Sequence, residues 1–159
     1  MSLLRVQYDL IRGSRQALFQ YLETMPPQVL NEEQAALGNR SLASLLTHVA
    51  NNYLYWMDQV ALEEKPSYFQ EASIQHMVDA RRQFAAVDRN VYRFLEHYTS
   101  LEDLPRMMQV PHLNTHGHFS PLDIFTHVTT HEFHHKGQLC AAGRQMGYTP
   151  PDTDIIRFQ

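Results

Sequence analysis

The stretch that decides the fold is residues 120–147, SPLDIFTHVTTHEFHHKGQLCAAGRQMG. Ser120 is a good N-cap, Pro121 suits the first position of a helix, and the acid Asp123 follows at the third position. Gly147 is typical of the residue just past a helix end. The stretch therefore predicts one long helix over Pro121–Met146.

Four of the chain's ten histidines lie on this predicted helix. Residues four apart on a helix share a face and lie about 6 Å apart along the axis, so their imidazoles can bind one ion. His127 and His135 lie about 12 Å apart along the axis, too far for a single zinc ion. Helical angles place His131 and His135 inside or beside the apolar stripe, and place His127 and His134 away from it. The predicted pair is therefore His131 and His135, and a further ligand must come from another segment.

Three more long helices are predicted upstream, over residues 3–25, from Ser41 to about Leu62, and from Ser73 to Tyr98. Residues 99–119 contain two prolines and a glycine, so we expect them to be irregular, with room for a short extended piece at 107–110. Four helices of about 25 residues predict an all-α four-helix bundle, a fold that builds metal sites from facing helices. We expect one domain over residues 1–159.

The third metal ligand is predicted at His48, which lies on the flank of the apolar stripe of the second helix. A lone histidine beside an apolar face is more often a hydrogen-bonded core residue than a ligand. Two neutral imidazoles buried side by side would need separate partners, whereas one shared cation satisfies both. The candidate ligands are therefore His48, His131 and His135, with His127 beside the site and His134 in solvent.

The same residues also match H-E-x-x-H, a zinc-protease motif in which Glu132 would be the general base. Proteases of this kind take a further ligand downstream, but no histidine or glutamate follows His135, and Gln138 stands where the extended motif has glycine. No strands are predicted that could hold a peptide. A protease is therefore a minor alternative, and Glu132 and His127 are candidate auxiliary residues.

Composition excludes several classes of function. The chain has 13 Lys+Arg against 17 Asp+Glu, a formal net charge of −4, and its basic residues are scattered. Such a chain has no basic field for nucleic acid or an anionic membrane. Arg5 and Asp9 interrupt the N-terminus before any apolar run long enough for a signal peptide or membrane span. With the single Cys140, which suits a reducing compartment, this predicts a cytoplasmic protein.

The segments that carry the histidines resemble the DinB/YfiT-like superfamily of bacterial proteins. The resemblance rests on SLLTHVANNYLYWM at 44–57, THVTTHEFHHKGQL at 126–139 and GRQMGYTPPDTD at 143–154. The hallmark is a histidine on the second helix followed by H-x-x-x-H-[RK]-G-Q on the last long helix. The match covers nearly the whole chain in length and motif order, with Lys136 where arginine is commoner.

This resemblance implies that His48, His131 and His135 bind a divalent ion, usually zinc or nickel. It also implies a four-helix bundle of up-down-down-up topology, often assembled as a homodimer. Relatives include transferases and isomerases that use low-molecular-weight thiols such as bacillithiol or mycothiol. Three neutral imidazoles leave an open metal position, where a bound thiol or water loses its proton near neutral pH.

The expected function is therefore a metal-dependent transferase that activates a thiol for attack on a small electrophile. A metal-dependent hydrolase using metal-bound water and a non-catalytic metal-binding protein are the alternatives. Tyr53 and Trp56 of the second helix are expected to line the substrate pocket or to fill the core, and core filling is favoured more for Trp56 than for Tyr53. Gln138 and Lys136 are expected to orient substrate or, slightly favoured, to stabilise the helix end. Three histidines before the last helix either overhang the site or belong to a loop without function: His112, His116 and His118.

Overall fold

The computed structural model describes residues 3–98 and 105–156 of the chain. Within these ranges the chain is mostly helical, with one small two-stranded sheet. The α-helices are α1 (Leu3–Leu22), α2 (Pro27–Asn31), α3 (Leu42–Tyr53), α4 (Met77–His97) and α5 (Pro121–Gln145). The other elements are the 3-10 turns η1 (Ala35–Leu37) and η3 (Pro111–Leu113), the π-helix η2 (Leu54–Ala61), and the strands β1 (Arg106–Val110) and β2 (Thr115–Phe119).

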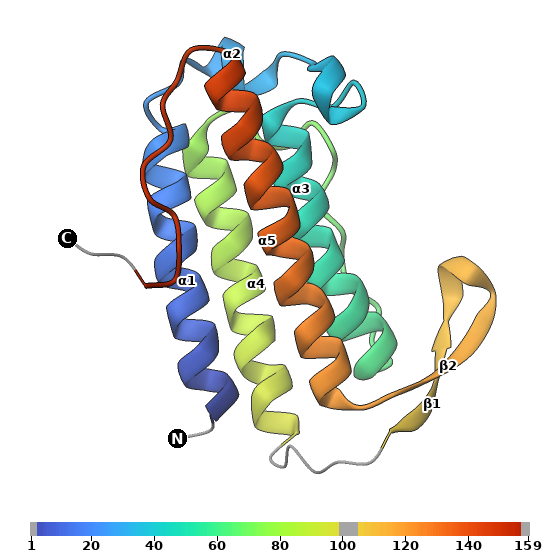
Figure 1. The fold of residues 1–159 in the computed structure, drawn as a ribbon. Helices are drawn as coiled ribbons and strands as arrows, with labels where there is room; N and C mark the ends of the chain where they lie inside the picture. Colours follow the sequence, from blue (N-terminus) through green and yellow to red (C-terminus); the bar gives the residue numbers. More distant parts are fainter. Residues whose placement is uncertain (1–2, 99–104, 157–159) are drawn as a thin grey trace.

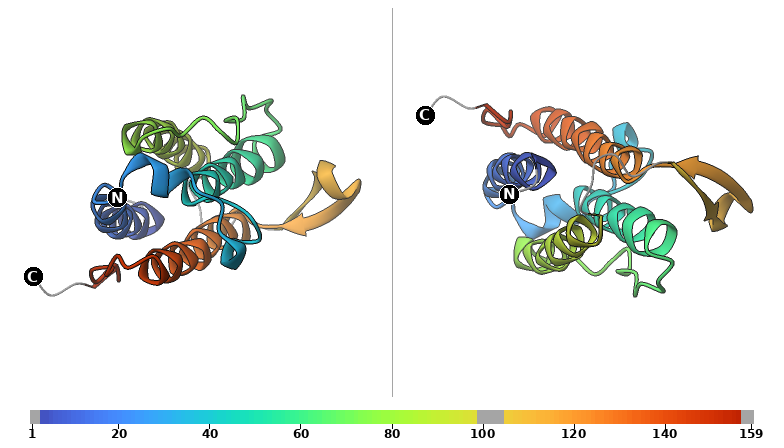
Figure 2. Two further views of the ribbon diagram at one scale, coloured as in Figure 1. Left: turned by 90° about the horizontal axis from the view of Figure 1, so that it is seen from above. Right: turned by 90° about the horizontal axis from the view of Figure 1, so that it is seen from below.

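The four long helices α1, α3, α4 and α5 lie side by side, with α2 at one end of them (Figure 1). Seen from above and from below, they surround a common interior (Figure 2). Helices α1 and α3 each contact both α4 and α5. Buried apolar side chains from all four helices fill this interior, including Phe19, Leu46, Phe94 and Ile124. Helices α3 and α5, which carry the candidate ligands, are therefore direct neighbours.

Serine caps fix where two of these helices begin. Ser41 and Ser120 each accept a hydrogen bond through Oγ from the backbone N–H three residues later, at 3.0 and 3.1 Å. Both starts agree with the sequence prediction. Helix α3 continues directly into η2, which ends where the Leu62 N–H donates to the carbonyl of Met57, five residues earlier. The predicted second helix is thus observed over its full length, but its last part is π-helical, a rare geometry that is frequent at functional sites.

Residues 106–119 form a β-hairpin where the sequence predicts an irregular stretch. Strands β1 and β2 pair antiparallel, and Asn114 in the turn between them has a φ of 48°, which asparagine tolerates. The extended piece predicted at 107–110 lies within β1. Strand β2 is not predicted, because its side chains are exposed or only half-buried and no apolar alternation marks it. The all-α expectation is therefore corrected to a mostly helical fold with a small sheet.

Helix ends differ from the prediction at two further places, and the short helix α2 is not predicted. Helix α1 ends at Leu22 rather than Met25, because the chain tightens there into bonds between residues three apart. Helix α4 begins at Met77 rather than Ser73. Its start is set by Asp79, whose carboxylate accepts the backbone N–H of the capping residue at 3.0 Å.

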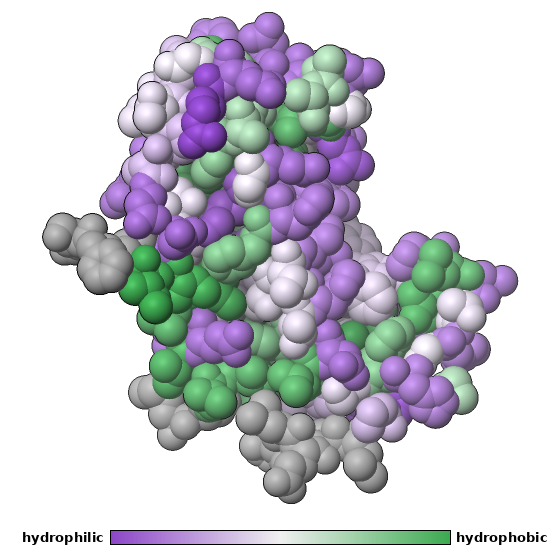
Figure 3. Space-filling view, viewed as in Figure 1, coloured by the Kyte–Doolittle hydropathy of each residue, from purple (hydrophilic) through white to green (hydrophobic). Residues whose placement is uncertain are grey.

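Exposed apolar side chains occur in several parts of the molecule, including α1, the hairpin and the C-terminal segment. On the face shown in Figure 3, apolar surface gathers around the ends where α1 and α5 begin, while the opposite end is mostly hydrophilic. Leu3 and Leu10 on α1 and Leu122 on α5 are among the exposed side chains. None of the described helices combines the length and the apolar character that a membrane span requires.

A buried ion network links all four long helices. Arg15 of α1 donates through Nε and Nη2 to the two carboxylate oxygens of Glu132 on α5, at 2.7 and 2.8 Å, and through Nη1 to Asp88 on α4, at 2.7 Å. The Tyr53 hydroxyl of α3 donates to Glu132 at 2.5 Å, and the Tyr8 hydroxyl donates to Asp88 at 2.7 Å. Arg15 is 3% exposed and Glu132 is 6% exposed. Each charge is thus paired inside the core.

We predict that Glu132→Leu lowers the free energy of unfolding by about 3 kcal/mol, because it leaves the buried Arg15 charge with only Asp88 as a counter-ion. Chemical denaturation of the two proteins measures the difference. The control is Arg82→Gln, which removes an exposed ion pair to Asp79 on the surface of α4 and should barely change stability. Equal effects of the two substitutions would contradict the role given to the network.

Candidate metal centre

The structure brings the three predicted ligands together between α3 and α5. His48 comes from α3, and His131 and His135 come from successive turns of α5. Each offers a ring nitrogen, and these nitrogens all lie within 4.8 Å of one another. The ring centroid of His48 lies 5.1 Å from that of His131 and 5.0 Å from that of His135. No carboxylate or thiol of the described residues joins this group.

The distances and charges of this cluster fit a divalent ion. The Nε2 atoms of His131 and His135 lie 3.2 Å apart. Two nitrogens bound to one tetrahedral zinc ion, each at about 2.0–2.1 Å, are about 3.3 Å apart. Burial, together with the neighbouring His135 and His48, lowers the pKa of His131 to about 3. Burial also lowers the pKa values of His48 and His135. The imidazoles are therefore neutral, as metal ligands must be.

Gln138 fixes how His135 presents its ring. The Nδ1 of His135 lies 2.7 Å from the amide oxygen of Gln138, which can only accept, so we assign the proton to Nδ1. The lone pair is then on Nε2, the atom that faces His131. Metal-binding histidines typically donate their second nitrogen in this way. Gln138 thus orients a candidate ligand, a role that neither sequence interpretation of this residue includes.

Two other residues of the motif are engaged away from the histidine cluster. Lys136 is buried, and its Nζ donates to the Ser14 hydroxyl at 2.9 Å and to the Thr153 carbonyl at 2.5 Å, which ties the C-terminal segment to α1. Glu132 has both carboxylate oxygens bound by Arg15, and one of them also by Tyr53. Lys136 therefore has the structural role, and Glu132 belongs to the buried network.

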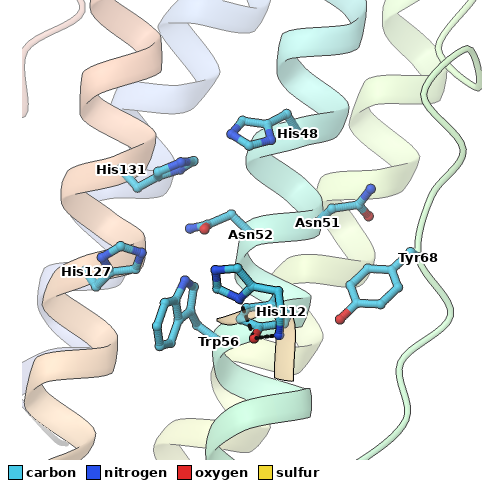
Figure 4. Close-up of a pocket in the computed structure, with 9 residues that line it drawn as sticks. His48, Asn51, Asn52, Trp56, Tyr68, His112, His127 and His131 are labelled. Carbon is cyan, nitrogen blue, oxygen red and sulfur yellow. Dashed lines mark hydrogen bonds between the residues drawn. The ribbon is translucent and has the colours of Figure 1, made fainter. Parts of the chain in front are cut away.

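A pocket of about 470 Å³ opens beside the cluster, with His48 and His131 in its wall (Figure 4). Trp56, for which the sequence favours core filling, lines the pocket as well as packing against the core, and its ring lies 4.7 Å from that of His127, centroid to centroid. Tyr53 does not line it: this side chain is 1% exposed and points into the core toward Glu132. The pocket is lined by side chains from α3, η2, the segment before α4, the hairpin and α5: His48, Asn51, Asn52, Tyr55, Trp56, Tyr68, His112, His127 and His131.

Of the three histidines before α5, only His112 reaches this pocket. Its Nδ1 lies 2.6 Å from the Tyr55 hydroxyl, which also accepts the His112 backbone N–H at 3.2 Å. His116 and His118 line other cavities, and His134 is exposed as predicted. The sequence does not predict Tyr55 as a pocket residue. Tyr55 lies one residue before Trp56 and therefore outside the apolar stripe of the predicted second helix.

We predict that the protein binds one divalent ion per chain. Alanine at His48, His131 or His135 should each weaken binding by more than about 100-fold, because removal of a ligand costs more than removal of a residue that orients one. Metal analysis after dialysis against zinc or nickel measures this. His134→Ala is the matched control, an exposed histidine beside His135 on the same helix. Ligand variants that retain as much metal as this control would refute the site.

We also predict that the metal-free protein loses stability as the pH falls from 7 to 5.5. Unfolded histidines titrate near pH 6.5, whereas burial lowers the folded pKa values of His48, His131 and His135. The unfolded state then binds more protons, so the free energy of unfolding decreases as pH falls through this window. Urea unfolding after chelation measures the slope, and His131→Gln should make it shallower. A slope that is unchanged in this variant would argue against a buried, neutral His131.

Comparison with known proteins agrees with the family resemblance that the histidine motifs indicate. No curated protein matches the chain in sequence. The family model described as the DinB family matches residues 1–159, the full length given, and so includes α3, α5 and the three clustered histidines. This confirms the resemblance noted from the segments 44–57 and 126–139. The chain, with its histidine cluster between α3 and α5, belongs to the DinB family.

Proposed function

We propose that this protein is a metal-dependent transferase that activates a low-molecular-weight thiol for attack on a small electrophile. Zinc or nickel is the proposed ion, held by His48, His131 and His135. The observation that carries the proposal is the position of the cluster of neutral imidazoles beside a pocket of about 470 Å³, with His48 and His131 in the pocket wall. An ion that served only to hold the bundle together would need no such pocket beside it.

The proposed reaction requires a thiolate and a binding site for the electrophile that it attacks. When bound, the ion holds the thiol sulfur and lowers its pKa, so that thiolate is available near neutral pH. The sulfur forms a bond to an electrophilic carbon, and the leaving group departs with the electron pair of the bond that breaks. His127 lines the pocket with its ring 5.9 Å from that of His131, and burial lowers its pKa. Neutral His127 is our candidate to accept the thiol proton.

A second cavity supplies room for the thiol. It measures about 240 Å³ and shares His48 and Asn51 with the main pocket, so both cavities border the candidate ligand His48. Arg40 and Glu71 line the second cavity, whereas no charged residue lines the described main pocket. Low-molecular-weight thiols commonly carry both amino and carboxylate groups, which this charged cavity can pair. We therefore assign the thiol to the second cavity and the electrophile to the main pocket.

Glu132 does not support the hydrolase alternative. A general base must have a free oxygen within hydrogen-bond reach of the water that it deprotonates. Both oxygens of Glu132 are bound by Arg15, so neither is free for proton transfer. A hydrolase would therefore have to rely on His127. The same network and the apolar core already hold the helices together, which argues against an ion with a purely structural role.

The resemblance also carries proposals about assembly. The helix directions in Figure 1 and the contacts of α1 and α3 with both α4 and α5 support the up-down-down-up four-helix bundle. The exposed apolar side chains of Leu3, Leu10 and Leu122 are our support for a homodimer, because exposed apolar surface can mark a protein interface. We keep the cytoplasm as the proposed compartment.

We predict that the zinc- or nickel-loaded protein accelerates the reaction of cysteine with 1-chloro-2,4-dinitrobenzene, in which a carbon–sulfur bond forms and chloride leaves. His131→Ala should lower kcat/KM by at least about 100-fold, because the thiolate loses its metal. His134→Ala should keep the activity of the native protein. Absorbance of the thioether product measures the rate.

The alternatives give different results in the same experiment. Hydrolysis of ester or amide substrates without any thiol, lost in His131→Ala, would favour the hydrolase. Metal binding that stabilises the fold without turnover of any substrate would favour a structural ion. Either result would refute the transferase.

A further inference from the structure

We propose that Asn52 makes the main pocket selective for an uncharged aromatic electrophile that carries an oxygen acceptor, such as a carbonyl or nitro group. The inference deepens the proposed function and rests on it, because it names the substrate class of the same site. Asn52 would donate its amide N–H to the acceptor oxygen and so place the ring of the substrate beside the metal position.

Asn52 lies between the candidate metal site and the aromatic wall of the pocket. It follows His48 by one helical turn and precedes Trp56 by one turn, and the three side chains share one face of the helix. Figure 4 shows the Asn52 side chain extending from α3 toward α5, between His48 and Trp56. A group bound to its amide would therefore lie directly below the histidine cluster.

The amide nitrogen of Asn52 has an unused hydrogen-bonding capacity. Its Nδ2 is buried, and no residue in the described part of the chain accepts a hydrogen bond from it. Native proteins rarely leave a buried donor unpaired, because this costs about 1–3 kcal/mol. A donor of this kind at the wall of a pocket is typical of a site that pairs with its ligand.

The neighbouring Asn51 shows the contrast. Its Nδ2 donates to the Phe69 carbonyl at 2.9 Å, and its Oδ1 accepts the Phe69 backbone N–H at 2.9 Å. Asn51 therefore uses its amide to hold the segment before α4 against α3. Two adjacent asparagines thus line the same pocket. The Nδ2 of Asn51 donates a hydrogen bond within the protein, whereas the Nδ2 of Asn52 does not donate to any described residue.

The lining of the pocket suits an uncharged, planar ligand. Of the described residues that line it, none is Asp, Glu, Lys or Arg. A charged ligand would lose its hydration there and could pair only with the ion, whose charge the thiolate already offsets in part in the proposed function. The rings of Tyr55 and Trp56 are perpendicular, with centroids 5.4 Å apart. Ring arrangements of this kind favour further edge-to-face contacts with an aromatic ligand.

The inference predicts an unusual pair of stability effects. Asn52→Leu keeps the branching and the number of heavy atoms of the side chain and removes an unpaired buried donor beside an open pocket, so the melting temperature should stay the same or rise. Asn51→Leu, the same substitution one residue earlier, should lower it, because the Phe69 backbone loses both partners. Thermal unfolding of the two variants measures this contrast.

Binding of unreactive probes tests the recognition directly. Benzamide is uncharged and carries an acceptor oxygen, cumene has a similar shape without an acceptor, and benzoate has a similar shape with a negative charge. Trp56 is the chain's one tryptophan and lines the pocket, so its fluorescence reports binding, and saturation-transfer NMR gives a second readout. We expect Asn52→Leu to weaken benzamide binding about tenfold and to leave cumene binding unchanged. In His131→Ala, which lacks the charge of the ion, benzoate should bind at least about tenfold more weakly than benzamide.

Three results would overturn the inference: equal benzamide affinity in the native protein and Asn52→Leu, a fall in melting temperature in Asn52→Leu, or loss of metal in that variant. The last would make Asn52 a residue that positions a ligand rather than one that binds substrate. Benzamide has no leaving group, so its binding does not depend on thiol transfer. Failure of the transferase assay and failure of this inference are therefore separate results.

Discussion

The ion pair between Arg15 and Glu132 sets the geometry on which the histidine cluster depends. Glu132 directly follows His131, so a carboxylate held by α1 on one side of α5 fixes the rotation of that helix about its own axis. Successive residues of a helix differ by about 100° in direction. With Glu132 turned toward Arg15 and Tyr53, His131 and His135 are turned toward His48 on α3. Two adjacent residues thus serve different parts of the structure: Glu132 belongs to the buried ion network, and His131 belongs to the histidine cluster.

Two buried charges are costly, and their pairing does not make the fold stable by itself. Replacement of a buried ion pair by apolar residues of similar volume is often neutral or stabilising, whereas loss of one partner is strongly destabilising. The network therefore acts mainly on specificity: any other rotation of α5 would leave the buried Arg15 with Asp88 as its one charged partner among the described residues. Tyr53 restricts the rotation of α5 further, because its hydroxyl donates to Glu132 from α3. The relative placement of α1, α3 and α5 is held by bonds to a single carboxylate.

Local sequence predicts the helices and the three clustered histidines, because these depend on patterns within one segment. The caps at Ser41 and Ser120 mark helix starts, and the spacing of His131 and His135 places both on one face. The partners of Glu132 lie 79 and 117 residues away in the chain, so no local pattern indicates them. The exposed strand β2 has no alternation to detect. Sequence patterns therefore locate the candidate ligands but do not show which side chains surround them.

The same limit explains why H-E-x-x-H has a different meaning here from its meaning in a zinc protease. The motif requires a glutamate with a free oxygen beside the metal-bound water. In this chain the motif is present in sequence, and the two histidines do lie beside a third. Glu132 is bound by Arg15 and Tyr53, and it is 6% exposed. A glutamate with both oxygens paired to an arginine cannot accept a proton without breaking a buried ion pair, so the partners of Glu132, rather than its place in the motif, exclude it as the base.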